Sequence, residues 1–179
     1  MRRSLVITFT GLDRPGMVEL LARTVVEGNG NWEGSRLTRL AGYFAGVLHA
    51  SAPTLAADAL AHSLTALSNE DFSVRVEVGA DSQAVGEREQ LRVEVTAVER
   101  TGIVRAICGA LSSHGVSILE LATNIAQAPM GGGELFRADL RLECPPELSQ
   151  EALIAALEEL GDGIAVDVEV DDGADKGGR

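Results

Sequence analysis

The chain carries two copies of one pattern, and this internal repeat constrains its fold more than any other feature. At an offset of 86 residues, the alternating apolar segment that starts at Leu5 recurs at Leu91, and the glycine-containing turn at Gly16 recurs at Gly102. After each turn, apolar residues recur three and four positions apart, as on one face of a helix. Repetition of this kind is typical of a duplicated supersecondary unit. The sequence therefore predicts two structurally similar units.

Each half of the sequence is predicted to fold as βαββαβ. In the first half we expect strands at residues 5–10, 31–40, 43–51 and 72–78, and helices at 15–27 and from Pro53. In the second half we expect strands at 91–98, 117–126, 135–143 and 164–170, a helix starting at Gly102, and a second helix that contains Leu153, Ile154, Leu157 and Leu160. The last strands match at an offset of 92, so residues 128–133 are an insertion. The predicted fold class is α+β: two ferredoxin-like domains, each an antiparallel sheet with helices on one face.

Composition places the boundaries between these units. With 179 residues, of which 45% are hydrophobic, the chain can bury two cores of the size that small domains have. Residues 80–90 are small, polar and charged, as linkers between domains usually are. We therefore expect one domain at residues 1–79, a second at 91–170, and a disordered acidic tail at 171–179.

The charge of the chain argues against nucleic acid as a direct partner. The formal net charge is −12, and residues 87–179 alone carry 8 basic and 18 acidic side chains. A protein that binds nucleic acid needs a basic surface to neutralise phosphates. No apolar run is long enough to cross a bilayer, and the first residues lead into an alternating strand instead of a signal segment. We expect a cytoplasmic protein that contacts neither nucleic acid nor membrane directly.

The residue types that catalyse reactions or bind metals do not occur in the motifs that those functions use. Cys108 and Cys144 form no CxxC pair, and the three histidines lack the spacing of metal ligands. GxSxG, Walker A and HExxH motifs are absent from the sequence. Aromatic residues make up only 3% of the chain, too few for an RNA-stacking sheet. We predict a non-enzymatic protein without metal or cofactor.

Two short segments resemble a known family. Asp13, Arg14, Pro15 and Gly16 form a turn that opens a helix, and the step Asn31-Trp32-Glu33 begins the second strand. These segments resemble the first ACT domain of the glycine cleavage system transcriptional repressor family. The second copy of the turn, at residues 98–104, is similar, with Glu where the first has Asp and Thr where it has Pro. The resemblance extends over most of the chain.

The resemblance implies a regulatory protein that senses a small amino acid, with glycine as the first candidate. In that family the protein partner is a transcription activator that itself binds DNA, so control of transcription would be indirect. The resemblance also allows a stand-alone regulatory subunit of a metabolic enzyme. In similar ACT proteins the ligand lies between two domains, the turn of one facing the second strand of its neighbour. Pairing of the two units within this chain or across a homodimer could build such a site, and we expect a homodimer. A small enzyme with an unfamiliar site and a purely structural pairing module remain as alternatives of another class.

A physical argument supports the repeated turn as the ligand site. A helix N-terminus presents unpaired N–H groups and partial positive charge, which suit the carboxylate of an amino acid, and glycine permits close approach. The ammonium group would need oxygen acceptors from the turn or from the start of the second strand. The candidate residues are Leu12, Asp13, Arg14, Gly16, Met17, Asn31 and Glu33 in the first unit, and Glu99, Arg100, Gly102, Ile103 and Ser117 in the second.

Each of these residues also has a structural interpretation. Gly16 could serve only to turn the chain tightly, and Asp13 could cap the following helix. Arg14 and Arg100 could be solvated surface charges. Trp32, the only tryptophan, could fill a core or an interface. Asn29 and Gly115 follow the two helices at aligned positions and are predicted to provide left-handed C-terminal caps.

Overall fold

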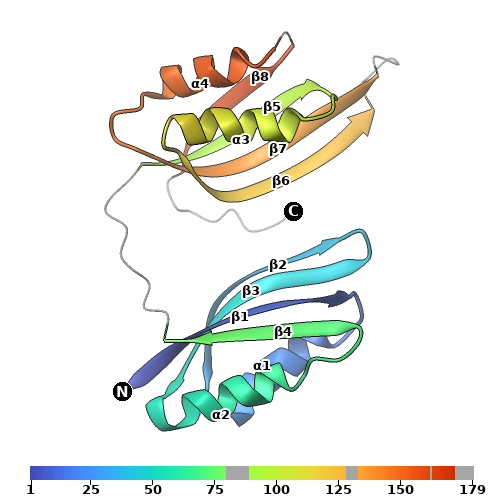
Figure 1. Ribbon diagram of the computed structural model, residues 1–179, viewed down its shortest axis with the longest axis vertical. Coiled ribbons are helices and arrows are strands. Elements are labelled where there is room, and N and C mark those ends of the chain that lie inside the picture. Colours follow the sequence, from blue (N-terminus) through green and yellow to red (C-terminus); the bar gives the residue numbers. More distant parts are fainter. Residues whose placement is uncertain (80–88, 128–132, 162, 172–179) are drawn as a thin grey trace. The chain divides into compact units, whose positions relative to one another are not determined.

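The computed structural model describes residues 1–79, 89–127, 133–161 and 163–171 of the chain (Figure 1). It divides into two compact units, Met1–Ala84 and Val85–Arg179. Strand β4 ends at Val78 and strand β5 begins at Glu89, so β5 includes the last two residues of the expected linker. The linker residues 80–88, the tail residues 172–179 and most of the expected insertion, 128–132, lie outside the described residues.

The first unit has the predicted βαββαβ order and the sheet order β2-β3-β1-β4, in which all neighbouring strands are antiparallel. Its elements are β1 (Arg2–Leu12), α1 (Met17–Glu27), β2 (Asn31–Leu40), β3 (Tyr43–Pro53), α2 (Thr54–Thr65) and β4 (Phe72–Val78). The turn between β2 and β3 is Ala41-Gly42, as expected, and both residues have positive φ.

The second unit repeats this topology with the sheet order β6-β7-β5-β8, again antiparallel throughout. Its elements are β5 (Glu89–Val98), α3 (Ile103–Ser113), β6 (Ser117–Gln127), β7 (Glu134–Cys144), α4 (Gln150–Glu158) and β8 (Ala165–Val170). Figure 1 shows that two helices cover one face of the sheet in each unit and leave the other face without helices. The predicted fold, two ferredoxin-like domains, is confirmed.

Alternation of apolar residues along the strands explains why each sheet has a helix-covered face. Leu5, Ile7 and Phe9 of β1 point to the same side and are buried, as are Leu91, Val93 and Val95 of β5. Helices α1 and α3 each contribute three apolar residues spaced about one turn apart to these cores: Met17, Leu21, Val25, Ile103, Ile107 and Leu111. Burial of such side chains stabilises a fold by roughly 1.5–3 kcal/mol each.

Two predicted boundaries, the start of the first helix and the start of the C-terminal tail, need correction. Helix α1 begins at Met17 and not at Pro15, because Gly16 adopts the left-handed conformation and serves as the N-cap. Asp171 was expected to start a disordered tail. Its side chain is only 3% exposed, because Arg92 and Arg141 donate hydrogen bonds to its two carboxylate oxygens at 3.2 and 2.8 Å.

Both units carry a β-bulge at the same place in the repeat. The register between β2 and β3 shifts at Glu33, and the register between β6 and β7 shifts at Leu119, which is 86 residues later. A bulge inserts one unpaired residue and redirects its side chain. The predicted left-handed caps are also present, since Asn29 has φ 57° and Gly115 has φ 69°.

Candidate functional site

The two repeated turns have nearly the same backbone geometry. Gly16 has φ 92° and Gly102 has φ 87°, and each glycine carbonyl accepts the first hydrogen bond of its helix, from Leu20 at 2.9 Å or from Ala106 at 3.0 Å. No side chain caps either helix N-terminus. A Cβ placed on either glycine would meet no atom within 4 Å. The glycines are therefore required by the backbone, and the space beside them is open.

In the first unit, the turn carboxylate is held within the unit. Asp13 Oδ2 lies 2.8 Å from Nε of Arg39, which lies near the end of β2, and the amide N–H of Asp13 donates to the carbonyl of Gly42 at 2.9 Å. The interpretation of Asp13 as the cap of α1 is therefore wrong. Its side chain faces the second strand, where it pairs with a cation.

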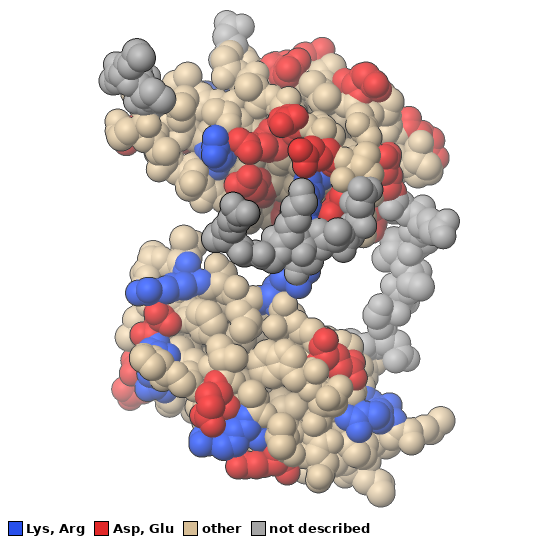
Figure 2. Space-filling view, turned by 180° about the vertical axis from the view of Figure 1, so that it is seen from behind, with Lys and Arg blue, Asp and Glu red and all other residues tan. Residues whose placement is uncertain are grey.

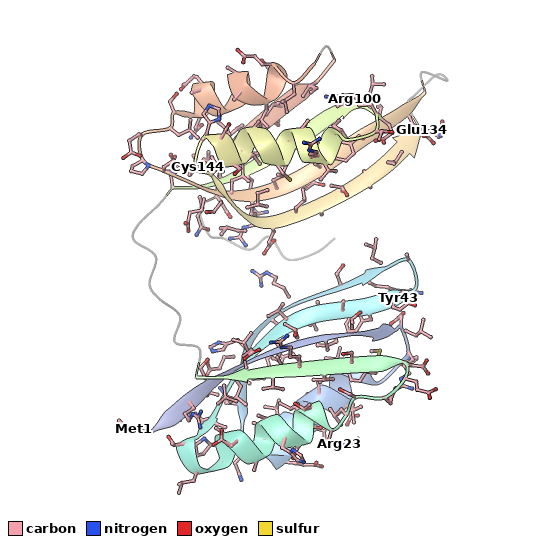
Figure 3. The ribbon with its side chains drawn as sticks, viewed as in Figure 1. Met1, Arg23, Tyr43, Arg100, Glu134 and Cys144 are labelled. Carbon is pink, nitrogen blue, oxygen red and sulfur yellow. The ribbon has the colours of Figure 1, made fainter. Side chains whose placement is uncertain are left out.

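In the second unit, the equivalent carboxylate lacks such a partner. The amide N–H of Glu99 donates to the carbonyl of Glu134 at 3.0 Å, which repeats the contact made by Asp13. Oxygen Oε2 of Glu99 is buried, and no described residue hydrogen bonds to it. The neighbouring Arg100 donates to the carbonyl of Leu160 at 2.9 Å, just beyond helix α4. Figure 3 labels Arg100 and Glu134 at the end of the unit opposite Cys144.

A pocket of about 420 Å³ lies beside the second turn. The structure brings four of the predicted site residues to it: Glu99, Arg100, Gly102 and Ile103. The other lining residues were not predicted, and they come from the start of α3, the far half of β6 and the start of β7: Val104, Thr123, Asn124, Ile125 and Phe136. This arrangement combines a helix N-terminus, a carboxylate and an apolar wall, which together suit a small zwitterion.

The predicted residues on the second strands lie away from the turns of their own unit. Asn31 pairs with Ser51 at one end of the sheet, whereas Leu12 pairs with Tyr43 at the other end. Ser117 of the second unit likewise pairs with Glu143, far from the turn. Within one unit, the structure therefore does not bring Asn31 or Ser117 to the turn that precedes it.

Glu33 also has a partner of its own. Its Oε2 lies 3.4 Å from Nδ1 of His49, and Nε2 of His49 lies 2.8 Å from the hydroxyl oxygen of Ser4. Three other predicted residues differ from one another in exposure: Met17 is buried in the core, Leu12 is half exposed and Arg14 is exposed. The side chain of Met17 therefore packs in the core, and only its backbone can face a ligand.

Charged side chains are distributed differently over the two units. On the face drawn in Figure 2, acidic side chains gather over the second unit, while basic and acidic side chains mix on the first.

Within the described ranges, no group of three or more His, Cys, Asp or Glu residues could hold a metal ion. The helices described in the structure are also too short or too polar to cross a membrane.

The sequence did contain a signal for the missed part of the pocket. At the repeat offset of 86, Arg39 aligns with Ile125. The strand register supports this alignment, because Arg39 pairs with Phe44 and Ile125 pairs with Phe136. A comparison of the two turns together with their second strands would have identified this position.

Comparisons with known proteins agree with this architecture. Residues 3–79 match the model of an ACT domain family. The fold is similar to the crystal structure of an unknown protein from Galdieria sulphuraria, with 28% identity, a TM-score of 0.78, and coverage of 95% of this chain and 99% of that one. It is also similar to a "putative glycine cleavage system transcriptional repressor", with 14% identity, a TM-score of 0.67, and coverage of 95% and 99%. No curated protein matches the chain by sequence. The first unit thus matches an ACT domain, and the chain folds as two tandem ferredoxin-like units.

Proposed function

We propose that this protein senses a small amino acid and regulates a protein partner according to whether that ligand is bound. Residues 3–79 match an ACT domain, and ACT domains are regulatory modules that generally bind amino acids, which supports a sensing role. The observation that carries the proposal for this chain is the uncapped helix N-terminus at Gly102, which lies beside a 420 Å³ pocket whose lining also includes Glu99.

The chemistry of the pocket matches the two charged ends of an amino acid. The first N–H groups of α3 carry partial positive charge and would hold the ligand carboxylate. Glu99, which also lines the pocket, would accept hydrogen bonds from the ammonium group. Because a Cβ at Gly102 would project into open space, glycine keeps this approach clear. Few such contacts are needed, since a millimolar ligand requires only about −4 kcal/mol of binding free energy.

The proposed partner is a protein and not DNA. One structural relative is described as a transcriptional repressor, and by resemblance the ligand would be glycine or another small amino acid. The net charge of −12 disfavours direct contact with phosphates, so we propose that control of transcription passes through a DNA-binding partner. A coupling free energy of about 1–3 kcal/mol between the ligand and the partner would suffice for a switch. We further propose that the protein acts in the cytoplasm, without catalysis, as a homodimer.

Calorimetric titration of the full chain with a panel of amino acids tests the sensing role. We expect saturable heat with at least one small amino acid, and loss of that heat in the Gly16→Val or the Gly102→Val variant. Gly109→Ala, on the exposed side of α3, is the matched control and should bind normally. If no amino acid gives heat with the unmodified protein, the sensing role is refuted.

The proposed homodimer needs a separate measurement. Light scattering after size-exclusion chromatography gives the molar mass directly, and the monomer has a mass of 18.8 kDa. We expect twice this mass in the presence of the amino acid that gives heat. A monomer mass with and without ligand would refute the dimer and leave the sensing role standing.

A further inference from the structure

The two turns use the same backbone frame but leave their carboxylates in different situations. The amide N–H groups of Asp13 and Glu99 donate to Gly42 and Glu134, which are equivalent carbonyls at the start of the third strand of each unit. The backbone frame of the two turns is therefore the same. The Asp13 carboxylate pairs with Arg39 of the second strand, and Oε2 of Glu99 is buried without a hydrogen-bond partner among the described residues.

One exchange on the second strand accounts for this difference. Arg39 of β2 and Ile125 of β6 occupy equivalent register positions, each paired with a phenylalanine of the third strand. In the first unit, the guanidinium group of Arg39 reaches Asp13 at 2.8 Å. In the second unit, the isoleucine offers no cation, and Ile125 lines the pocket instead. Glu99 lines the pocket, and no described residue hydrogen bonds to its Oε2, so an ammonium group that enters the pocket gains by pairing with this carboxylate.

The remaining walls of the pocket restrict what that donor can belong to. Ile103, Ile125 and Phe136 form an apolar surface beside Glu99. Apolar walls favour a ligand that buries a hydrocarbon group. The polar residues Thr123 and Asn124 complete the rim on β6. These features together fit an amino acid with an aliphatic side chain.

We propose that the second unit alone binds the ligand, that Glu99 binds its ammonium group, and that in the first unit Arg39 occupies the corresponding place. The ligand class is an α-amino acid with an aliphatic side chain. This inference rests on the proposed sensing function and refines it. Among the described residues, the receptive pocket then lies in the second unit, and the duplicated turn of the first unit is closed by an ion pair of its own.

Titration calorimetry of the full chain with glycine, L-alanine, L-valine and L-leucine tests the inference. The probe 4-methylpentanoate, which is leucine without its amino group, tests the ammonium contact. We expect one equivalent per chain, tighter binding of valine or leucine than of glycine, and binding of 4-methylpentanoate weaker by roughly 10- to 100-fold.

Two variants separate the roles of Glu99 and Ile125. Glu99→Gln should weaken leucine binding by roughly 10- to 100-fold and leave 4-methylpentanoate binding unchanged. Ile125→Arg copies the first unit into the second, and the new guanidinium should abolish leucine binding by pairing with Glu99. Position 125 is 56% exposed, so the arginine should not unfold the protein, which circular dichroism checks. Glu94→Gln, on the surface of β5, is the matched control and should bind normally.

The outcomes distinguish this inference from the function on which it rests. Normal leucine binding by Glu99→Gln or by Ile125→Arg would overturn the inference while amino-acid sensing stands. Two equivalents per chain would overturn the assignment to one unit. Equal affinity for glycine and leucine would overturn the aliphatic ligand class. Absence of heat with every amino acid would refute the sensing function and the inference together.

Discussion

Alanine substitution at two glycines of the second unit should change stability in opposite directions. Gly102 has φ 87°, a conformation that costs a residue with a Cβ about 1–2 kcal/mol. Gly109 lies inside α3 on its exposed side, where alanine is favoured over glycine by about 0.5–1 kcal/mol. A Cβ at either position would meet no atom within 4 Å, so steric clashes contribute to neither effect.

The expected difference between the two variants is therefore roughly 2 kcal/mol in the free energy of unfolding of the second unit. For a domain of this size, 1 kcal/mol shifts the melting temperature by about 4–8 °C. Urea or thermal unfolding followed by far-ultraviolet circular dichroism measures the effect. Fluorescence would not serve, because the only tryptophan, Trp32, lies in the first unit. If Gly102→Ala were as stable as the unmodified protein, the left-handed turn would not exist as described.

Three further predictions concern stability and reactivity. Although burial acts to raise the pKa of Asp171, hydrogen bonds from Arg141 and Arg92 hold this pKa below its ordinary value. The stabilising contribution of the Asp171 carboxylate is therefore fully present above pH about 3.9, and it is lost as the pH falls through the lower pKa of the folded state. The Asp171→Asn variant should accordingly be less stable than the unmodified protein at pH 7. Urea titrations should show that this difference in unfolding free energy shrinks below pH 4, and a difference that stays constant with pH would contradict the prediction. The hydroxyl oxygen of Ser149 accepts a hydrogen bond from the amide of Ala152 and so caps the start of α4. The Ser149→Ala variant should therefore lose about 1 kcal/mol of unfolding free energy, and an unchanged urea midpoint would count against this cap. Burial, followed by the charge of Glu89, raises the pKa of the Cys144 thiol, so a thiol reagent should modify Cys108 first and Cys144 only on unfolding, as mass spectrometry of the native protein can check.

The repeat made the architecture predictable from the sequence. The alternation from Leu5 and its copy from Leu91 identified both central strands, and the glycines at 16 and 102 located both turns. Duplication helps because a weak pattern seen twice at one offset is unlikely to be accidental. Two boundaries were predicted less well, the start of α1 and the start of the C-terminal tail. The left-handed conformation of Gly16 makes α1 begin at Met17, and long-range hydrogen bonds from Arg92 and Arg141 hold Asp171 in place. The contacts to Asp171 are not local in the sequence, whereas the cap at Gly16 is adjacent to the helix it starts.

The candidate site was predictable only where its residues are neighbours in the sequence. Glu99, Arg100, Gly102 and Ile103 follow one another and were identified as a group, while the wall from β6 depends on strand pairing. For the same reason, a local interpretation assigned Asp13 to the helix that follows it. In the structure, Asp13 pairs with Arg39, which is distant in the sequence and is brought close to Asp13 by folding.

The exchange of Arg39 for Ile125 shows how duplication can separate structure from function. Both units need the turn, the bulge and the helix to build a core, so these features occur in both copies. The side chain opposite the turn carboxylate contributes little to either core, because Ile125 and Arg39 are both largely exposed. That position was therefore able to change without cost to the fold. An arginine there completes an ion pair within the first unit, and an isoleucine forms part of the apolar lining of the pocket in the second.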